Sequence, residues 1–163
     1  MRLVLNSAAT PSSGARVSLI GDDGGSTELL KRRARELGIA EAITFKGAQP
    51  RAELPDAYRA ASVCVVPSRF ESMSYTCMEA MACGRPVVAA RTGALPEVIT
   101  DGVDGLLVPP EDPAALAAAI GRLLLDEAAR RRLGEAARAR VLSSFSRRIV
   151  AARMAGLYEE IAR

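Results

Sequence analysis

Residues 63–109 read VCVVPSRFESMSYTCMEAMACGRPVVAARTGALPEVITDGVDGLLVP, and they carry most of the evidence for the architecture. They begin with a strand that is apolar at nearly every position, which is typical of a strand buried on both faces of a parallel sheet. A polar loop with Glu71, a short helix with Glu79 and a second apolar strand at Pro86 follow. Because open α/β sheets bind ligands at the carboxyl ends of their strands, this pair of acids indicates a ligand site.

On both sides of this stretch, strand-like and helical patterns alternate, which predicts an α/β fold with a Rossmann-like, doubly wound parallel sheet. Strands are expected at residues 17–21, 43–47, 62–66, 86–90 and 105–108. Helices are expected at residues 27–37, 50–61, 75–83, 114–125, 127–142 and 147–162, with a helical turn at 95–99. The residues placed to cap four of these helices are Ser26, Asp112, Asp126 and Ser146. The 163 residues suffice for one domain with a sizeable core.

Several blocks of sequence occur in a fixed order. They are the E-x7-E pair Glu71 and Glu79, the run EAMACGRPVV at 79–88, PEVI at 96–99 and DGVDGLLVP at 101–109. Together they resemble the carboxyl-terminal, nucleotide-sugar-binding domain of GT-B fold retaining glycosyltransferases of family 4, the glycosyl transferases group 1. The likeness extends over the chain from about residue 16 onward. A lone E-x7-E pair would be weak evidence, whereas these blocks in this order are specific.

The opening of the chain departs from that family. The family's carboxyl-terminal domain begins with a strand and a Gly-Arg…Lys-Gly motif whose basic side chains hold the donor diphosphate, and nothing in residues 1–14 matches it. We therefore predict an atypical or mobile opening segment at 1–14 and the GT-B domain at 15–163. The resemblance also implies a missing partner, the amino-terminal GT-B domain that holds the acceptor. The chain alone is expected to be inactive and to bind nucleotide weakly.

The resemblance implies a role for each acid of the pair. Glu71 would accept hydrogen bonds from hydroxyls of the donor sugar and is the candidate catalytic residue, since one carboxylate can accept from two hydroxyls at once. Glu79 would accept hydrogen bonds from the ribose hydroxyls of the nucleotide. Two alternatives stay open. Glu71 could be a solvated loop acid, and Glu79 could complete a capping box that begins at Thr76.

Backbone groups are implied to bind the rest of the donor. Amides at the start of the short helix, where N–H groups lack helical partners, would bind the diphosphate and the sugar; they belong to Met73, Ser74, Tyr75 and Thr76. Ala48 and Gln49, which follow the strand at 43–47, would contact the base. The family usually has Gly in place of Ser74, and a positive φ there would cost ~1 kcal/mol or more. Gly93 is implied to border the site.

The resemblance therefore implies a hexosyl-type glycosyltransferase whose donor domain binds a nucleotide-diphosphate sugar for transfer to an acceptor with retention. No cofactor is implied and no metal is expected; Asp22 and Asp23 read as a turn rather than a metal pair. Two other classes stay open. One is a non-catalytic nucleotide-binding or interaction module, and the other is a GT-B relative such as a sugar-nucleotide epimerase. The absence of any histidine argues against the epimerase.

Composition limits the partners and the location. The formal net charge of +3 is too small to indicate nucleic-acid binding, and no apolar run is long enough to span a membrane. Cys64, Cys77 and Cys83 fall in apolar settings and are expected to be buried free thiols in a reducing compartment. A cytoplasmic location is therefore predicted, with peripheral membrane association open for the full-length enzyme. A homodimer formed through an exposed surface is also open.

Overall fold

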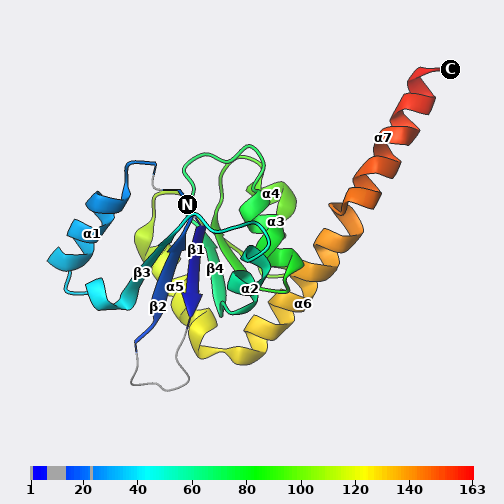
Figure 1. Ribbon diagram of the computed structural model, residues 1–163. Coiled ribbons are helices and arrows are strands. Elements are labelled where there is room, and N and C mark those ends of the chain that lie inside the picture. The colour runs from blue at the N-terminus through cyan, green and yellow to red at the C-terminus, as the bar shows by residue number, and fades with distance from the viewer. Residues whose placement is uncertain (1, 7–13, 23) are drawn as a thin grey trace.

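The computed structural model describes residues 2–6, 14–22 and 24–163, and Figure 1 shows a central sheet with helices on both of its faces. The strands are β1 (Arg2–Asn6), β2 (Arg16–Ile20), β3 (Ile43–Gly47), β4 (Val63–Val66), β5 (Val87–Ala90) and β6 (Leu106–Val108). The helices are α1 (Thr27–Glu36), α2 (Leu54–Arg59), α3 (Tyr75–Ala82), α4 (Leu95–Val98), α5 (Pro113–Leu125), α6 (Glu127–Ser144) and α7 (Arg147–Ile161), with a 3-10 turn η1 (Ala40–Ala42). The helix predicted at 50–61 is reduced to α2.

The sheet has the strand order β3-β2-β1-β4-β5-β6. β2 and β3 pair in parallel, as do β4, β5 and β6, which confirms the predicted α/β class and the doubly wound order. β1 is the exception, because it runs antiparallel to both β2 and β4. A parallel connection would need a crossover of about a dozen residues or more, whereas residues 7–15 are all that join β1 to β2. The predicted strands therefore form a parallel sheet, and β1, which was not among them, is the antiparallel strand at its centre.

This strand lies inside the segment 1–14, for which we predicted an atypical or mobile opening. Residues 2–6 of that segment form β1, while residues 1 and 7–13 lie outside the described residues. Arg2 pairs with Ile20, so β1 begins at the edge of the sheet where β2 ends. The chain thus fills the central position of the sheet with a strand of opposite direction.

Hydrophobic clusters cover both faces of the sheet. Along β4, Cys64 and Val66 join a cluster with residues of α3, α4 and α6, whereas Val63 and Val65 join a cluster with residues of α5. This alternation follows from the two-residue period of a strand. All four side chains are at most 4% exposed, which confirms the prediction of a strand buried on both faces.

Two of the four predicted caps are confirmed in full. Asp112 accepts a hydrogen bond from the N–H of Ala115, and Asp126 accepts one from the N–H of Ala129, each at 2.9 Å. Ser26 and Ser146 occupy the N-cap positions of α1 and α7 but do not accept a capping hydrogen bond there. These carboxylates cap α5, which packs on β4, β5 and β6, and α6, which packs on α3 and α5.

The three cysteines are free thiols. Cys64 and Cys77 are buried, and burial raises the pKa of each thiol to about 12. Cys83 is half-buried, and its pKa is also raised, mainly by burial. The predicted burial is therefore confirmed for two thiols and is only partial for Cys83.

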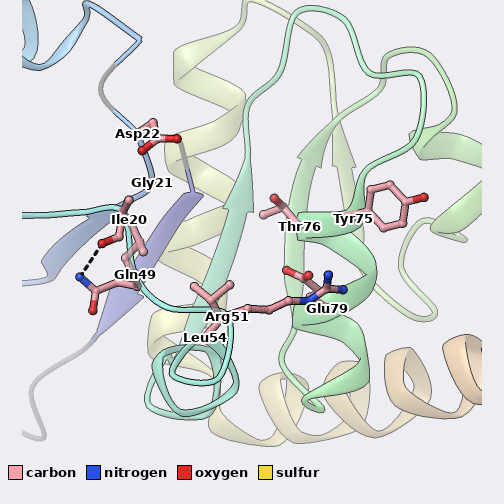
Figure 2. Close-up of a pocket in the computed structure, with 10 residues that line it drawn as sticks. Ile20, Gly21, Asp22, Gln49, Arg51, Leu54, Tyr75, Thr76 and Glu79 are labelled. Atoms are coloured by element: carbon pink, nitrogen blue, oxygen red, sulfur yellow. Dashed lines mark hydrogen bonds between the residues drawn. The ribbon is translucent and has the colours of Figure 1, made fainter.

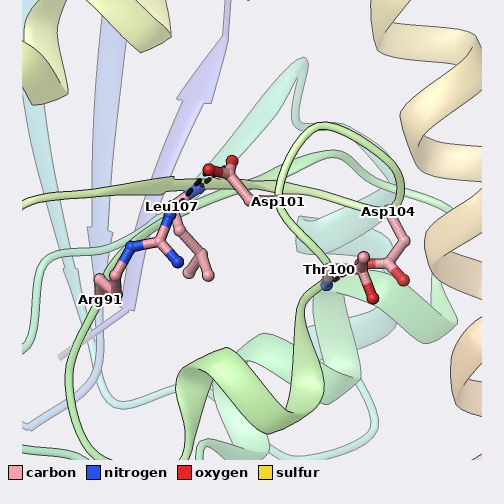
Figure 3. A network of polar contacts seen from close by, with 5 residues as sticks. All are labelled: Arg91, Thr100, Asp101, Asp104 and Leu107. Atoms are coloured by element: carbon pink, nitrogen blue, oxygen red, sulfur yellow. Dashed lines mark hydrogen bonds and ion pairs between the residues drawn. The ribbon is translucent and has the colours of Figure 1, made fainter.

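The loop that follows α4 is held by two aspartates whose carboxylates accept backbone N–H groups (Figure 3). Asp104 is 4% exposed and accepts from the N–H of Thr100 at 2.7 Å. Asp101 accepts from the N–H of Leu107 at 2.9 Å and forms an ion pair with Arg91 at 2.8 Å. The DGVDG run therefore shapes the turn that leads into β6.

Replacing Asp104 by alanine should lower the free energy of unfolding by about 1–2 kcal/mol, because the N–H of Thr100 would lose its acceptor. Asp104→Asn keeps a side-chain oxygen that can accept this hydrogen bond, so its free energy of unfolding should fall less. Urea denaturation of the three proteins at neutral pH measures the difference. An alanine variant as stable as the wild type would show that this hydrogen bond does not hold the turn.

Candidate functional site

A pocket of about 690 Å³ opens at the edge of the sheet where β2, β3 and β4 end (Figure 2). Three separate parts of the chain form it: the loop after β2, the loop between β3 and α2, and the first turns of α3. Its lining residues are Ile20, Gly21, Asp22, Ala48, Gln49, Arg51, Leu54, Tyr75, Thr76 and Glu79. A concave site at the carboxyl ends of parallel strands is where an α/β sheet usually binds its ligand.

Five of the eight residues predicted from the sequence line this pocket. They are Ala48, Gln49, Tyr75, Thr76 and Glu79. The other three, Glu71, Met73 and Ser74, belong to the loop before α3 and are not among the lining residues. The structure therefore brings together the residues predicted for the base and the ribose with two of the four predicted for the diphosphate, and it places Glu71 in the loop that leads into α3.

Glu79 accepts a hydrogen bond at Oε2 from the hydroxyl of Tyr58, at 2.9 Å. Glu79 comes four residues after Tyr75, the first residue of α3, and the N-cap of this helix is Ser74. The capping box that we considered for Thr76 and Glu79 is therefore wrong, since its acid would have to be the third residue of the helix. The carboxylate lies one turn into α3, on the wall of the pocket.

Ser74 caps α3 and is almost fully buried. Its Oγ accepts from the N–H of Cys77 at 3.3 Å, and its side chain is 2% exposed. Its φ is −85°, so the strain that a positive φ would impose on serine does not arise. Of the amides predicted to bind the diphosphate, that of Tyr75 donates to the carbonyl of Met73 at 3.1 Å. The Tyr75 amide is therefore already bonded within the turn that leads into α3.

The loop of Glu71 is fastened to the loop that follows β5. The carbonyl of Glu71 accepts from the N–H of Ala94 at 2.9 Å, and the carbonyl of Ser68 accepts from the hydroxyl of Thr92 at 3.0 Å. The hydroxyl of Ser68 also lies 3.3 Å from Glu71 Oε2, to which it donates. Gly93, which the sequence placed at the border of the site, lies directly against Glu71. These contacts fix the position of the acid.

The charge of the pocket is mixed. Asp22 and Glu79 are acidic, and among the described residues that line the pocket Arg51 is the one basic side chain. Figure 2 shows Arg51 reaching across the pocket toward α3. The side chain of Gln49 donates to the carbonyl of Lys46 at 2.8 Å, which folds it back onto its own loop. A ligand that carries both hydroxyls and an anionic group matches this arrangement.

Sequence reasoning missed Tyr58. A tyrosine in a short helix that packs on the core gives no signal of a role in a site, because a buried phenol commonly finds some polar partner. Only the fold brings α2 against α3 and places the Tyr58 hydroxyl on Glu79.

Comparison with known proteins identifies the family. The profile described as "Glycosyl transferases group 1" matches residues 4–140, most of the chain. The chain belongs to this family. Among curated relatives in the family, a D-inositol 3-phosphate glycosyltransferase of Corynebacterium jeikeium is 43% identical over 141 residues, which cover 86% of this chain and 33% of the relative. The chain therefore spans about a third of the length of that relative.

Solved structures of other proteins share the fold. The sucrose-phosphate synthase of Thermosynechococcus elongatus is 37% identical with a TM-score of 0.82, and the match covers 88% of this chain and 38% of that one. The Anabaena HepE protein, solved in complex with UDP, is 27% identical with a TM-score of 0.82, and the match covers 88% of this chain and 40% of that one. The predicted resemblance to GT-B glycosyltransferases is thus confirmed.

Within residues 2–6, 14–22 and 24–163, no helix is both long enough and apolar enough to cross a membrane. In the same part of the chain, no three side chains of the cysteine, aspartate or glutamate type gather in a way that could hold a metal ion. The expectation that the reaction needs no metal stays a prediction.

Proposed function

We propose that this chain is the donor-binding domain of a retaining glycosyltransferase and that its pocket binds a nucleoside diphosphate sugar. The observation that carries the proposal is the placement of Glu79 in a pocket at the carboxyl ends of the strands, in a chain of this family. The UDP in the HepE complex supports uridine diphosphate as the nucleotide. The domain that would bind the acceptor belongs to the amino-terminal part of such enzymes and is the proposed partner.

Each group of the donor has a counterpart in the site. Glu79 accepts hydrogen bonds from the ribose hydroxyls, which a carboxylate can do with both oxygens. The backbone around Ala48 and Gln49 contacts the base. The diphosphate lies against the start of α3, where the helix dipole favours an anion, and within reach of Arg51. Glu71 extends from the neighbouring loop to the hydroxyls of the sugar.

In the proposed reaction the bond between the sugar and the diphosphate breaks, and negative charge develops on the departing diphosphate. Donor groups that are already oriented stabilise this charge without reorganising in the transition state. The amide of Thr76 and the guanidinium of Arg51 are the proposed donors from this chain. No acid or base from this half is needed, and we expect no turnover without the partner domain. The buried free thiols favour a reducing compartment such as the cytoplasm.

Calorimetric titration of the chain with UDP, GDP and ADP tests the proposal. UDP should bind, and Glu79→Ala should weaken its affinity about 10- to 100-fold, because hydrogen bonds to a charged group are lost. Glu135→Ala is the matched control, since it removes the same charge from α6, away from the pocket. It should bind UDP as the wild type does.

The outcomes separate the alternatives. Binding of GDP or ADP in preference to UDP would correct the base but keep the site. Equal affinities of the wild type and Glu79→Ala for UDP would reject the assignment of Glu79 to the ribose.

A further inference from the structure

We propose that Tyr58 is a positioning residue that holds Glu79 in the orientation needed to bind the ribose. This inference rests on the proposed function, because it adds a second residue to the same half-site. It starts from one contact, the hydrogen bond of 2.9 Å that the Tyr58 hydroxyl donates to Glu79 Oε2. The two residues lie 21 positions apart and on different helices, α2 and α3.

The ring of Tyr58 is buried in the core. It is 3% exposed and belongs to the cluster that contains Ala61, Cys77 and Ala80. The ring therefore cannot turn away without opening the core between α2 and α3. Its hydroxyl donates to the carboxylate of Glu79, which is one of the residues that line the pocket.

Glu79, in contrast, is only half-buried and has three side-chain torsions to restrict. Ordering such a side chain on ligand binding costs conformational entropy. A rigid phenol that fixes Oε2 before the ligand arrives lowers this cost and orients the carboxylate plane. A carboxylate has about four lone-pair positions, so a bond to Tyr58 leaves it able to accept from ribose hydroxyls.

The core contact and the positioning role make different predictions for Tyr58→Phe. Phenylalanine keeps the ring and its packing but removes the hydroxyl. If the hydroxyl positions Glu79, the loss of nucleotide affinity must require both the Glu79 carboxylate and the ribose hydroxyls. If the residue only fills the core, the loss, if any, must be the same for every nucleotide.

The experiment titrates UDP and 2′,3′-dideoxy-UDP, which lacks both ribose hydroxyls, into wild type, Tyr58→Phe, Glu79→Ala and the double variant. Tyr58→Phe should weaken the binding of UDP about 3- to 10-fold, the size of one hydrogen bond. It should leave the affinity for 2′,3′-dideoxy-UDP unchanged. In the Glu79→Ala background it should have no further effect on UDP, because the group that it positions is absent.

Tyr158→Phe is the matched control, since it removes the same hydroxyl from an exposed residue of α7. It should bind both nucleotides as the wild type does. An unchanged UDP affinity in Tyr58→Phe, or an equal loss for both nucleotides, would overturn the positioning role and leave the Glu79 site intact. Failure of the wild type to bind any of UDP, GDP and ADP would overturn the site and the positioning role together. Thermal unfolding of each variant shows whether the core has been kept.

Discussion

Gly93→Ala should lower the free energy of unfolding by about 2–5 kcal/mol and displace the loop that carries Glu71. Gly93 has a φ of +49°, which an alanine adopts only at a cost of about 1–2 kcal/mol. Its new Cβ would overlap the carbonyl oxygen of Glu71 and lie 2.8 Å from the carbonyl carbon. Overpacking against backbone adds about 1–3 kcal/mol, because neither loop has a flexible side chain at the contact.

The contact is also the one through which Ala94 binds the Glu71 carbonyl, so relief of the overlap must lengthen that hydrogen bond. Gly102→Ala is the matched control. Gly102 has a φ of +76°, and nothing lies within 4 Å of the position that its Cβ would take. The free energy of unfolding of Gly102→Ala should therefore fall only by the backbone cost of the positive φ. Urea denaturation of both variants separates the two terms, and equal losses would mean that the two loops are not packed against each other.

Gly134→Ala should lower the free energy of unfolding by about 2 kcal/mol, although alanine is a better helix former than glycine. Gly134 lies in α6, where its Cβ would overlap the carbonyl oxygen of Gly84 and lie 3.1 Å from the carbonyl carbon. Beside this contact Arg138 donates to the carbonyl of Ala82 at 2.7 Å, at the end of α3. The added methyl group would push α6 away from the end of α3 and strain this hydrogen bond.

Gly121→Ala should change the free energy of unfolding in the opposite direction, on a similar helix. Gly121 lies inside α5, and nothing lies within 4 Å of its would-be Cβ. The substitution should raise the free energy of unfolding by about 0.5–1 kcal/mol, the difference in helix propensity. Chemical denaturation of the pair measures both values. A Gly134→Ala variant as stabilised as Gly121→Ala would show that α6 does not approach Gly84 as closely as described.

The parts of the fold that a local pattern encodes were predictable. The apolar run at 63–66 and the Asp-Pro and Asp caps of α5 and α6 depend on neighbouring residues, and the structure confirms each of them. The local pattern does not decide the N-cap of α3, because serine and threonine, at positions 74 and 76, are both favoured there. The buried position of Ser74 decides between them, and burial is a property of the fold.

The features that the sequence did not predict are those that tertiary structure creates. Nothing in residues 2–6 states the direction in which β1 will enter the sheet, since this depends on the length of the connection to β2 and on the space between β2 and β4. The bond from Tyr58 to Glu79 likewise joins two helices that the sequence separates by a strand and a loop. The resemblance located five of the lining residues, and the structure added Tyr58, which is hydrogen-bonded to one of them, Glu79.

The antiparallel β1 has a consequence for cooperativity. Among the described strands it alone joins β2 and β3 to β4, β5 and β6. The sheet therefore consists of two blocks of parallel strands, with β1 as the seam between them. The pocket lies across this seam, with Gly21 and Gln49 on one block and Glu79 on the other. A nucleotide in the proposed pocket would therefore contact both blocks and bridge them. Its binding energy would count toward keeping the blocks in register as well as toward holding the donor.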